Sequence, residues 1–110
     1  MVAQAVEKSV QEYIRAASEL GIAISRAVLF GSQARGDAGP WSDIDLVVIS
    51  PQLEPPVDPS VVRQLWRLRG HTDSRIEPIL CGEQQWQNDG KSVILEVARR
   101  EGVEVSLRPD

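Results

Sequence analysis

The sequence predicts an α/β or α+β fold, in which helices pack on a small mixed β-sheet. Segments with the apolar spacing of a helix and segments with that of a strand follow one another in the order helix, strand, strand, helix, strand, helix, strand. The second of these strands is apolar enough to be buried on both faces. The 110 residues, 42% hydrophobic and 25% charged, suit a single domain over residues 1–110.

The N-terminal segment is expected to form a helix over residues 3–20, ended by Gly21. Its apolar stripe consists of Val6, Val10, Tyr13, Ile14, Ala17 and Leu20. The next segment, IAISRAVLFG, has the β-branched and aromatic residues of a strand that ends at Gly31. SQAR then begins a helical turn.

After the loop GDAGPW, the segment DIDLVVIS is predicted to form the second strand. The following segment, PQLEPPVDPS, holds four prolines and is expected to be an exposed connection. Asp58 is the expected N-cap of the next helix, with Pro59 at its first position and Gly70 at its end.

The last third of the chain predicts a strand, a helix and a short final strand. SRIEPILC reads as a strand, and Pro78 inside it indicates an edge position or a bulge. KSVILEVARRE is expected to form a helix that Gly102 ends, and VEVSL alternates like a short strand.

Composition excludes several classes of function. The net charge of −4 argues against direct nucleic-acid binding through a basic surface. No apolar run approaches the ~20 residues of a membrane span, and the N-terminus lacks the basic start and apolar block of a signal peptide, so a cytoplasmic protein without membrane contact is expected. The single cysteine, Cys81, excludes an internal disulfide and is interpreted as a buried apolar residue.

Two aspartates at the entrance of the second strand indicate chemistry. Asp43 and Asp45 are two residues apart, so on a strand their side chains share one face. Neighbouring carboxylates repel each other unless water, hydrogen bonds or a cation compensates their charge. Mg²⁺ suits such a pair because it prefers oxygen ligands and completes its shell with water and substrate phosphates. The alternative is a polar turn in which Asp45 lies on a solvated face.

The junction Gly31-Ser32 supplies a complementary anion site. A glycine at a strand end allows a sharp turn and close approach of a ligand, and the following helical turn offers free N–H groups. Ser32 adds a hydroxyl, which we interpret as a phosphate contact and not as a nucleophile. Arg35 is one turn further on and is predicted either to bind phosphate or to form a structural ion pair with Asp37 or Asp43.

GSQARG followed by SDIDL resembles the signature of the DNA polymerase β-like nucleotidyltransferase superfamily, in which Gly-Ser precedes Asp-x-Asp by some ten residues. The short form is most similar to the minimal nucleotidyltransferases. The motif covers Gly31 to Leu46, and a looser similarity extends to ILEVARREGVEV. The resemblance implies the polymerase β-like nucleotidyltransferase fold, two Mg²⁺ ions, and transfer of a nucleotidyl group from a nucleoside triphosphate, with ATP expected, and release of pyrophosphate.

The resemblance also implies roles for individual residues. Gly31 and Ser32 would contact the triphosphate, and Asp43 and Asp45 would bind metal. A third carboxylate is expected on a neighbouring strand, where it would bind the second ion and activate the attacking hydroxyl. Glu77 is the first candidate, although the family more often has aspartate there, and Asp73 is the second. Glu77 as a plain surface residue is the alternative.

Minimal members of the family are commonly paired with a helical HEPN-domain protein, as the antitoxin of a toxin–antitoxin pair. The resemblance therefore implies adenylylation of a hydroxyl, such as that of a tyrosine, on a HEPN-type partner. An aminoglycoside-like acceptor is less consistent with so short a chain. The competing hypothesis is a non-catalytic binding module that neutralises its partner by docking.

Several other residues have alternative interpretations. Trp41 is expected either to stack on a base or to cover the strand entrance, the second being favoured. Trp66 and Trp86 are assigned to the core or to a partner surface, and His71 to a loop. The three arginines of the middle helix are expected on a solvated face and are Arg63, Arg67 and Arg69.

Overall fold

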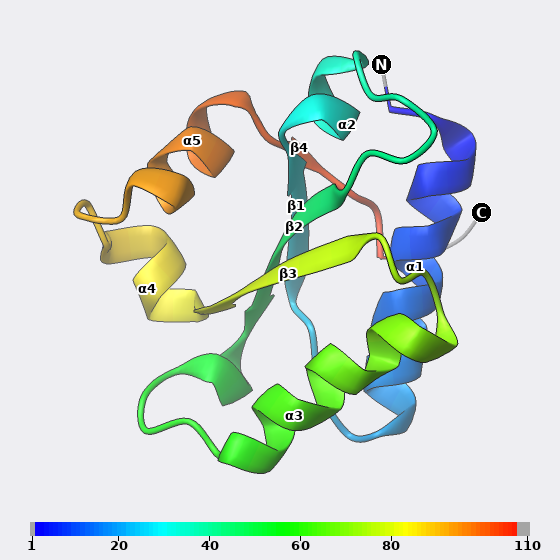
Figure 1. Cartoon of the computed structure of the whole chain (residues 1–110). Coiled ribbons are helices and arrows are strands. Elements are labelled where there is room, and N and C mark those ends of the chain that lie inside the picture. Colours follow the sequence, from blue (N-terminus) through cyan, green and yellow to red (C-terminus); the bar gives the residue numbers. More distant parts are fainter. Residues whose placement is uncertain (1, 108–110) are drawn as a thin grey trace.

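The computed structural model of the protein describes residues 2–107. A four-stranded mixed sheet lies at its centre (Figure 1). Its strand order is β3-β2-β1-β4. β1 is antiparallel to both β2 and β4, and β2 is parallel to β3. The predicted mixed sheet with packed helices is therefore confirmed. The bounds of the strands are β1 (Arg26–Phe30), β2 (Ile44–Ser50), β3 (Ile76–Gly82) and β4 (Val103–Glu104).

Helices cover both faces of this sheet. They are α1 (Gln4–Glu19), α2 (Ser32–Arg35), α3 (Pro59–Arg67), α4 (Glu83–Asn88) and α5 (Val93–Glu101), with the 3₁₀ turns η1 (Pro51–Leu53) and η2 (Leu68–His71). Figure 1 shows α1 and α3 on one side of the sheet and α4 and α5 on the other. The chain thus forms three layers, helix on sheet on helix.

Each face of the sheet has its own apolar core, because alternate residues of a strand point to opposite sides. Ala27 and Leu29 of β1 pack with the apolar stripe of α1 and with Leu65 of α3. Val28 and Phe30 pack with Trp86 of α4 and with the buried face of α5. From Leu46 to Ser50, β2 is fully buried, which confirms the prediction that this strand is covered on both faces.

The structure contains the helix start and stop residues predicted for α1 and α3, with a difference at the end of α3. The predicted stripe of α1 is buried except for Leu20, which follows the end of the helix and is exposed. Gly21 comes next, with a φ of 82°. At α3 the Asp58 carboxylate accepts a hydrogen bond from the Ser60 N–H at 2.9 Å, with Pro59 at the first helical position. α3 ends at Arg67, earlier than predicted, because the chain tightens into η2 before Gly70.

The sequence-based reading missed α4. Its segment, EQQWQN, presents only Trp86 to the core, so it has no apolar period to detect. The expected exposure of the proline-rich connection was partly wrong, because Leu53 of η1 is buried. β1 also begins later than predicted, at Arg26, although Ile22 and Ile24 ahead of it are buried.

Two smaller predictions are confirmed. Pro78 lies on β3, which is an edge strand and can tolerate a residue without an N–H donor. Cys81 is fully buried in the core beneath α4 and α5, and burial raises the pKa of its thiol to about 11. Among residues 2–107, no helix is long and apolar enough to cross a membrane.

Candidate active site

Asp45 occupies the point at which three strands come into register. It is the second residue of β2, and its Cα partners are Phe30 at the end of β1 and Glu77 on β3. Residues paired across neighbouring strands point to the same face of a sheet. Asp45 and Glu77 therefore share the face covered further along by α4 and α5, and both are partly buried.

The charge around Asp45 shows that predicted site residues lie together. Burial raises the pKa of Asp45 above its usual range, and the carboxylates of Asp43 and Glu77 raise it further. The guanidinium of Arg35 acts in the opposite direction but does not offset them. Asp43 itself lies just before β2 and is exposed. The structure thus gathers three carboxylates whose repulsion has no full internal compensation.

Gly31 provides the sharp turn beside this cluster. Its φ is 74°, in the region that residues with a side chain rarely adopt. A Cβ at this position would overlap the Oδ2 atom of Asp45. The chain therefore needs glycine here both for the turn and for the close approach of the backbone to the carboxylate.

The single turn of α2 begins directly at Ser32. The Gly31 carbonyl accepts the N–H groups of Ala34 and Arg35, both at 3.1 Å, and this closes the turn. Within the described part of the chain, the Ser32 hydroxyl has no hydrogen-bond partner. It remains free to contact a ligand, as the resemblance implies.

Arg35 has two carboxylate partners. Its guanidinium lies 3.2 Å from the Oδ2 atom of Asp37 and 3.3 Å from the Oε1 atom of Glu101, and about half of the side chain is exposed. The ion pair with Asp37 was one of the alternatives that the sequence left open. Because its charge also reaches Asp45, Arg35 is placed at the rim of the carboxylate cluster.

The two candidates for the third carboxylate are in different surroundings. Asp73 accepts hydrogen bonds from the backbone and guanidinium of Arg75, at 3.0 and 2.8 Å, and its pKa is lowered to about 2, mainly by this partner. The hydroxyl of Ser9 in α1 lowers this pKa further. Glu77 instead faces Asp45 across the strand register. The geometry therefore favours Glu77 as the third carboxylate.

Arg69 was predicted to lie on a solvated face, and this was wrong. Its guanidinium donates to the backbone carbonyls of Ser74 and Ile76 and lies 3.2 Å from the Oε1 atom of Glu77. It also lies over the ring of Trp66, 5.1 Å from the ring centre. The helical spacing of the arginines gave no sign of this, because Arg69 follows the end of α3 and lies in η2.

The carboxylate cluster suits a hard divalent cation. Asp43, Asp45 and Glu77 offer oxygen ligands only. Burial, together with the two neighbouring carboxylates, raises the pKa of Asp45, and a bound cation would favour its charged form. Within residues 2–107, however, no three acidic, histidine or cysteine side chains already stand as a metal-binding set. One oxygen of the Glu77 carboxylate is already engaged, in an ion pair with Arg69.

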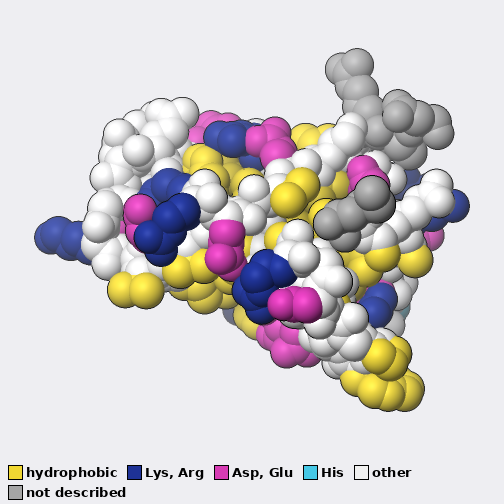
Figure 2. Space-filling view, turned by 90° about the horizontal axis from the view of Figure 1, so that it is seen from above, with side chains coloured by type: hydrophobic (Ala, Val, Ile, Leu, Met, Phe, Trp, Pro, Cys, Tyr) yellow, Lys and Arg dark blue, Asp and Glu magenta, His cyan; other side chains and the backbone are white. Residues whose placement is uncertain are grey.

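Trp41 was expected to cover the entrance of the second strand, and this expectation was wrong. Trp41 is 91% exposed, so it shields nothing in this structure. Figure 2 shows acidic and basic side chains interspersed on the end of the molecule where α2 lies, without a continuous basic stretch.

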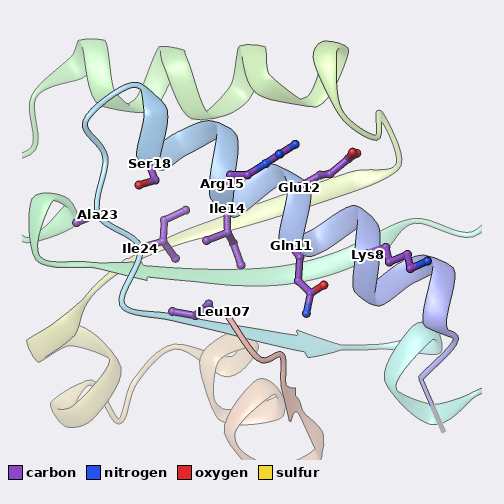
Figure 3. A pocket seen from close by; sticks show the side chains of 9 residues that line it. All are labelled: Lys8, Gln11, Glu12, Ile14, Arg15, Ser18, Ala23, Ile24 and Leu107. Carbon is purple, nitrogen blue, oxygen red and sulfur yellow. The ribbon is translucent and has the colours of Figure 1, made fainter. Parts of the chain in front are cut away.

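A separate hollow lies away from the carboxylates. It has a volume of about 640 Å³ and is bounded by α1, the segment before β1 and Leu107, as Figure 3 shows. Charged ends such as those of Lys8 and Arg15 surround apolar contacts from Ile14 and Ile24. None of the predicted site residues lines it, so its size carries no argument about the chemistry.

Comparison with known proteins identifies a family and a fold. Residues 10–107 match the family model of the nucleotidyltransferase domain. A Sulfolobus solfataricus protein assigned to the nucleotidyltransferases has the same fold, with a TM-score of 0.61 and 17% identity over 91% of this chain and 78% of that one. A toxin–antitoxin structure with AMP-PNP has a TM-score of 0.60 and 20% identity, over 91% and 72% of the two chains. No curated protein matches in sequence.

Proposed function

The chain belongs to the nucleotidyltransferase domain family, and from this premise we propose that it transfers a nucleotidyl group, AMP from ATP, to a hydroxyl of a partner protein. Asp43, Asp45 and Glu77 are the proposed metal ligands and catalytic carboxylates. Gly31, Ser32 and Arg35 are the proposed contacts of the triphosphate. Two Mg²⁺ ions are the proposed cofactors.

One observation carries this proposal: the strand register places Glu77 beside Asp45 while the turn at Gly31 runs against the same carboxylate. Residues from three separate segments converge there, and the convergence requires a positive φ and a partly buried acid with a raised pKa. A positive φ and a partly buried acid with a raised pKa both lower stability, and a protein without a functional site would not need them.

The residues divide the reaction between them. When bound, Mg²⁺ neutralises phosphate oxygens and makes the acceptor hydroxyl easier to deprotonate. The backbone at Gly31 and the hydroxyl of Ser32 hold the phosphates in line with the acceptor. The acceptor oxygen forms a bond to the α-phosphorus as the bond from that phosphorus to the bridging oxygen breaks. Pyrophosphate leaves, and Glu77 is the proposed acceptor of the hydroxyl proton.

The proposed partner is the toxin of a toxin–antitoxin pair, a helical HEPN-domain protein. Two lines support it: the motif GSQARG…SDIDL resembles the minimal nucleotidyltransferases, and the similar solved structure with AMP-PNP is that of a toxin–antitoxin complex. A tyrosine hydroxyl on that partner is the proposed acceptor.

A second candidate function is neutralisation of the partner by docking alone. The observation that favours it is the engagement of Glu77 with Arg69, which leaves two aspartates without an assembled third ligand. This candidate function retains the turn at Gly31-Ser32 but does not require transfer of a nucleotidyl group.

Calorimetric titration with ATP tests the site without knowledge of the acceptor. ATP is expected to bind in the presence of Mg²⁺, and binding should be lost with EDTA and in the Asp43→Ala/Asp45→Ala variant. Asp73→Ala is the control, since Asp73 is a partly buried aspartate, as Asp45 is, but is already paired with Arg75. Absence of binding to ATP and to the other nucleoside triphosphates by the folded protein would contradict the proposed site.

Transfer is tested by incubation of the chain and a candidate HEPN partner with ATP labelled at the α-phosphate. Label on the partner that requires Asp43 and Asp45 supports the enzyme. Neutralisation of the toxin by the double variant, without any label, supports docking instead.

A further inference from the structure

Arg69 is the most constrained cation next to the carboxylate cluster. Its guanidinium donates to two backbone carbonyls, those of Ser74 and Ile76, and lies over the ring of Trp66. Three acceptors and a ring leave it little freedom, and only about a quarter of the side chain is exposed. Such a planar, fixed cation differs from a surface lysine or arginine that changes partners freely.

This cation engages the one carboxylate that the cluster needs to complete a metal site. Glu77 is the Cα partner of Asp45 and contributes to the electrostatics of that aspartate. Its Oε1 atom nevertheless accepts from the Nη2 atom of Arg69 at 3.2 Å. Although Asp43, Asp45 and Glu77 lie near each other, they do not stand as a metal-binding set.

We propose that Arg69 is a positioning residue that holds the Glu77 carboxylate away from Asp43 and Asp45 until a divalent cation binds, and thereby limits the metal affinity of the site. The inference rests on the proposed function, because it concerns the same carboxylates. It adds a step that the family assignment does not contain: Glu77 must exchange a guanidinium for a metal ion.

The physical basis is competition between two cations for one carboxylate. In the metal-free protein the guanidinium lowers the repulsion within the cluster by pairing with Glu77. An arriving ion competes with the guanidinium for the Oε1 atom of that carboxylate and is also repelled by the guanidinium charge. The arrangement therefore weakens the first binding event while it keeps Glu77 within reach for the complete site.

Titration with Mn²⁺ alone tests the proposal, with free Mn²⁺ followed by its electron paramagnetic resonance signal. Removal of the cation in Arg69→Gln is expected to tighten Mn²⁺ binding by roughly five- to tenfold, since one repulsive charge is lost and Glu77 is freed. In Arg69→Gln/Glu77→Gln most of the gain should disappear. Equal or weaker binding by folded Arg69→Gln would overturn the proposal.

A matched control separates this effect from a general change of charge. Arg26 is also ion-paired, with Glu104, and also lies over a tryptophan, Trp86, but it occupies the opposite end of β1 from Phe30. Arg26→Gln should leave Mn²⁺ affinity unchanged within about twofold. An equal gain in Arg26→Gln would contradict a specific role for Arg69.

Two further measurements keep the outcomes distinct. Damage to the fold would lower the affinity for Mn²⁺, so an increase in affinity is not explained by damage. If Arg69→Gln does not fold, Arg69→Lys is the substitute variant. It keeps the positive charge but loses the planar guanidinium, and it should bind Mn²⁺ roughly twofold more tightly than the unaltered protein. No gain in a folded Arg69→Lys would then overturn the proposal. If the Asp45→Asn variant binds Mn²⁺ as tightly as the unaltered protein, the proposed function fails. If Asp45→Asn binds Mn²⁺ more weakly but Arg69→Gln shows no gain, only the role of Arg69 fails.

Discussion

Two acidic groups near the start of β3 behave in opposite ways. Asp73 is matched by Arg75 through backbone and side-chain hydrogen bonds, and its pKa falls to about 2. Asp45, on the neighbouring strand, is partly buried beside Asp43 and Glu77, and its pKa is raised. The first group is compensated within the fold, whereas burial and two neighbouring carboxylates disfavour the charge of the second, and Arg35 offsets this only in part.

This difference supports a structural role for Asp73 and the proposed functional role for Asp45. A paired acid stabilises the folded state because folding gives it a better partner than water. An acid that folding places among other acids lowers the stability of the metal-free protein. Such acids occur in proteins where a bound ligand compensates their charge. Substitutions at the two positions should therefore have opposite effects on stability and on activity.

The largest effect is expected for catalysis. Asp45→Asn should reduce nucleotidyl transfer by about a thousandfold, since loss of a ligand to a catalytic metal removes several kcal/mol of transition-state stabilisation. Asp73→Asn should retain activity within about threefold when assayed below its unfolding temperature. Rates of pyrophosphate release with saturating ATP measure both variants, and similar losses in the two would remove the distinction between the acids.

A second test perturbs the surroundings of Asp45 but leaves its charge in place. Gly31→Ala should lower the free energy of unfolding by about 2–3 kcal/mol, because the new Cβ would overlap the Asp45 carboxylate at a positive φ. Gly21→Ala is the control, since Gly21 has a φ of 82° but open space around its Cα. It should lower stability by only about 1 kcal/mol in urea denaturation, through the backbone penalty alone.

The paired acid gives a pH-dependent effect. At pH 7, Asp73→Asn should lower the free energy of unfolding by about 2 kcal/mol, since the pKa of Asp73 is lowered to about 2 from an ordinary 3.8. For a lowered pKa, the stabilisation is present above the ordinary value and is lost as the pH falls through the folded value. The variant and the unaltered protein should therefore converge below pH 2, as acid-dependent thermal unfolding would show.

The smallest effect is the most diagnostic one. Asp45→Asn should unfold at a slightly higher temperature than the unaltered protein when no metal is present, because the raised pKa of Asp45 means that its charge opposes folding at pH 7. The gain should shrink as the pH falls and Asp45 takes up a proton. A clear loss of stability at pH 7 would show that Asp45 is compensated within the fold, as Asp73 is.

The local signals in the sequence predicted most of the fold. The stripe of α1, the Asp58 cap and the edge position of Pro78 follow from rules that act over a few residues. α4 was missed because one buried tryptophan gives no period. The strand pairing was not predicted in register, since this depends on contacts between segments far apart in the chain.

The candidate site shows the same limit. The motif placed Gly31, Asp43 and Asp45 together, because they lie close in the sequence. It left Glu77 and Asp73 as alternatives, and only the pairing of β2 with β3 distinguishes them. Arg69 had no local signal at all, since its contacts to Glu77 and Ile76 arise where η2 meets the edge of β3.

The carboxylates of the candidate site differ in how firmly the sheet holds them. Asp45 lies on β2, which has neighbours on both sides, whereas Glu77 lies on β3 at the edge of the sheet. Backbone amides of an edge strand open to solvent more readily than those of an inner strand. We therefore expect faster hydrogen exchange at the Glu77 amide than at the Asp45 amide. A local fraying of β3 would then withdraw one proposed ligand while Asp45 stays on its inner strand. Under the proposed function, a nucleotide would remain bound during intervals in which transfer is not possible.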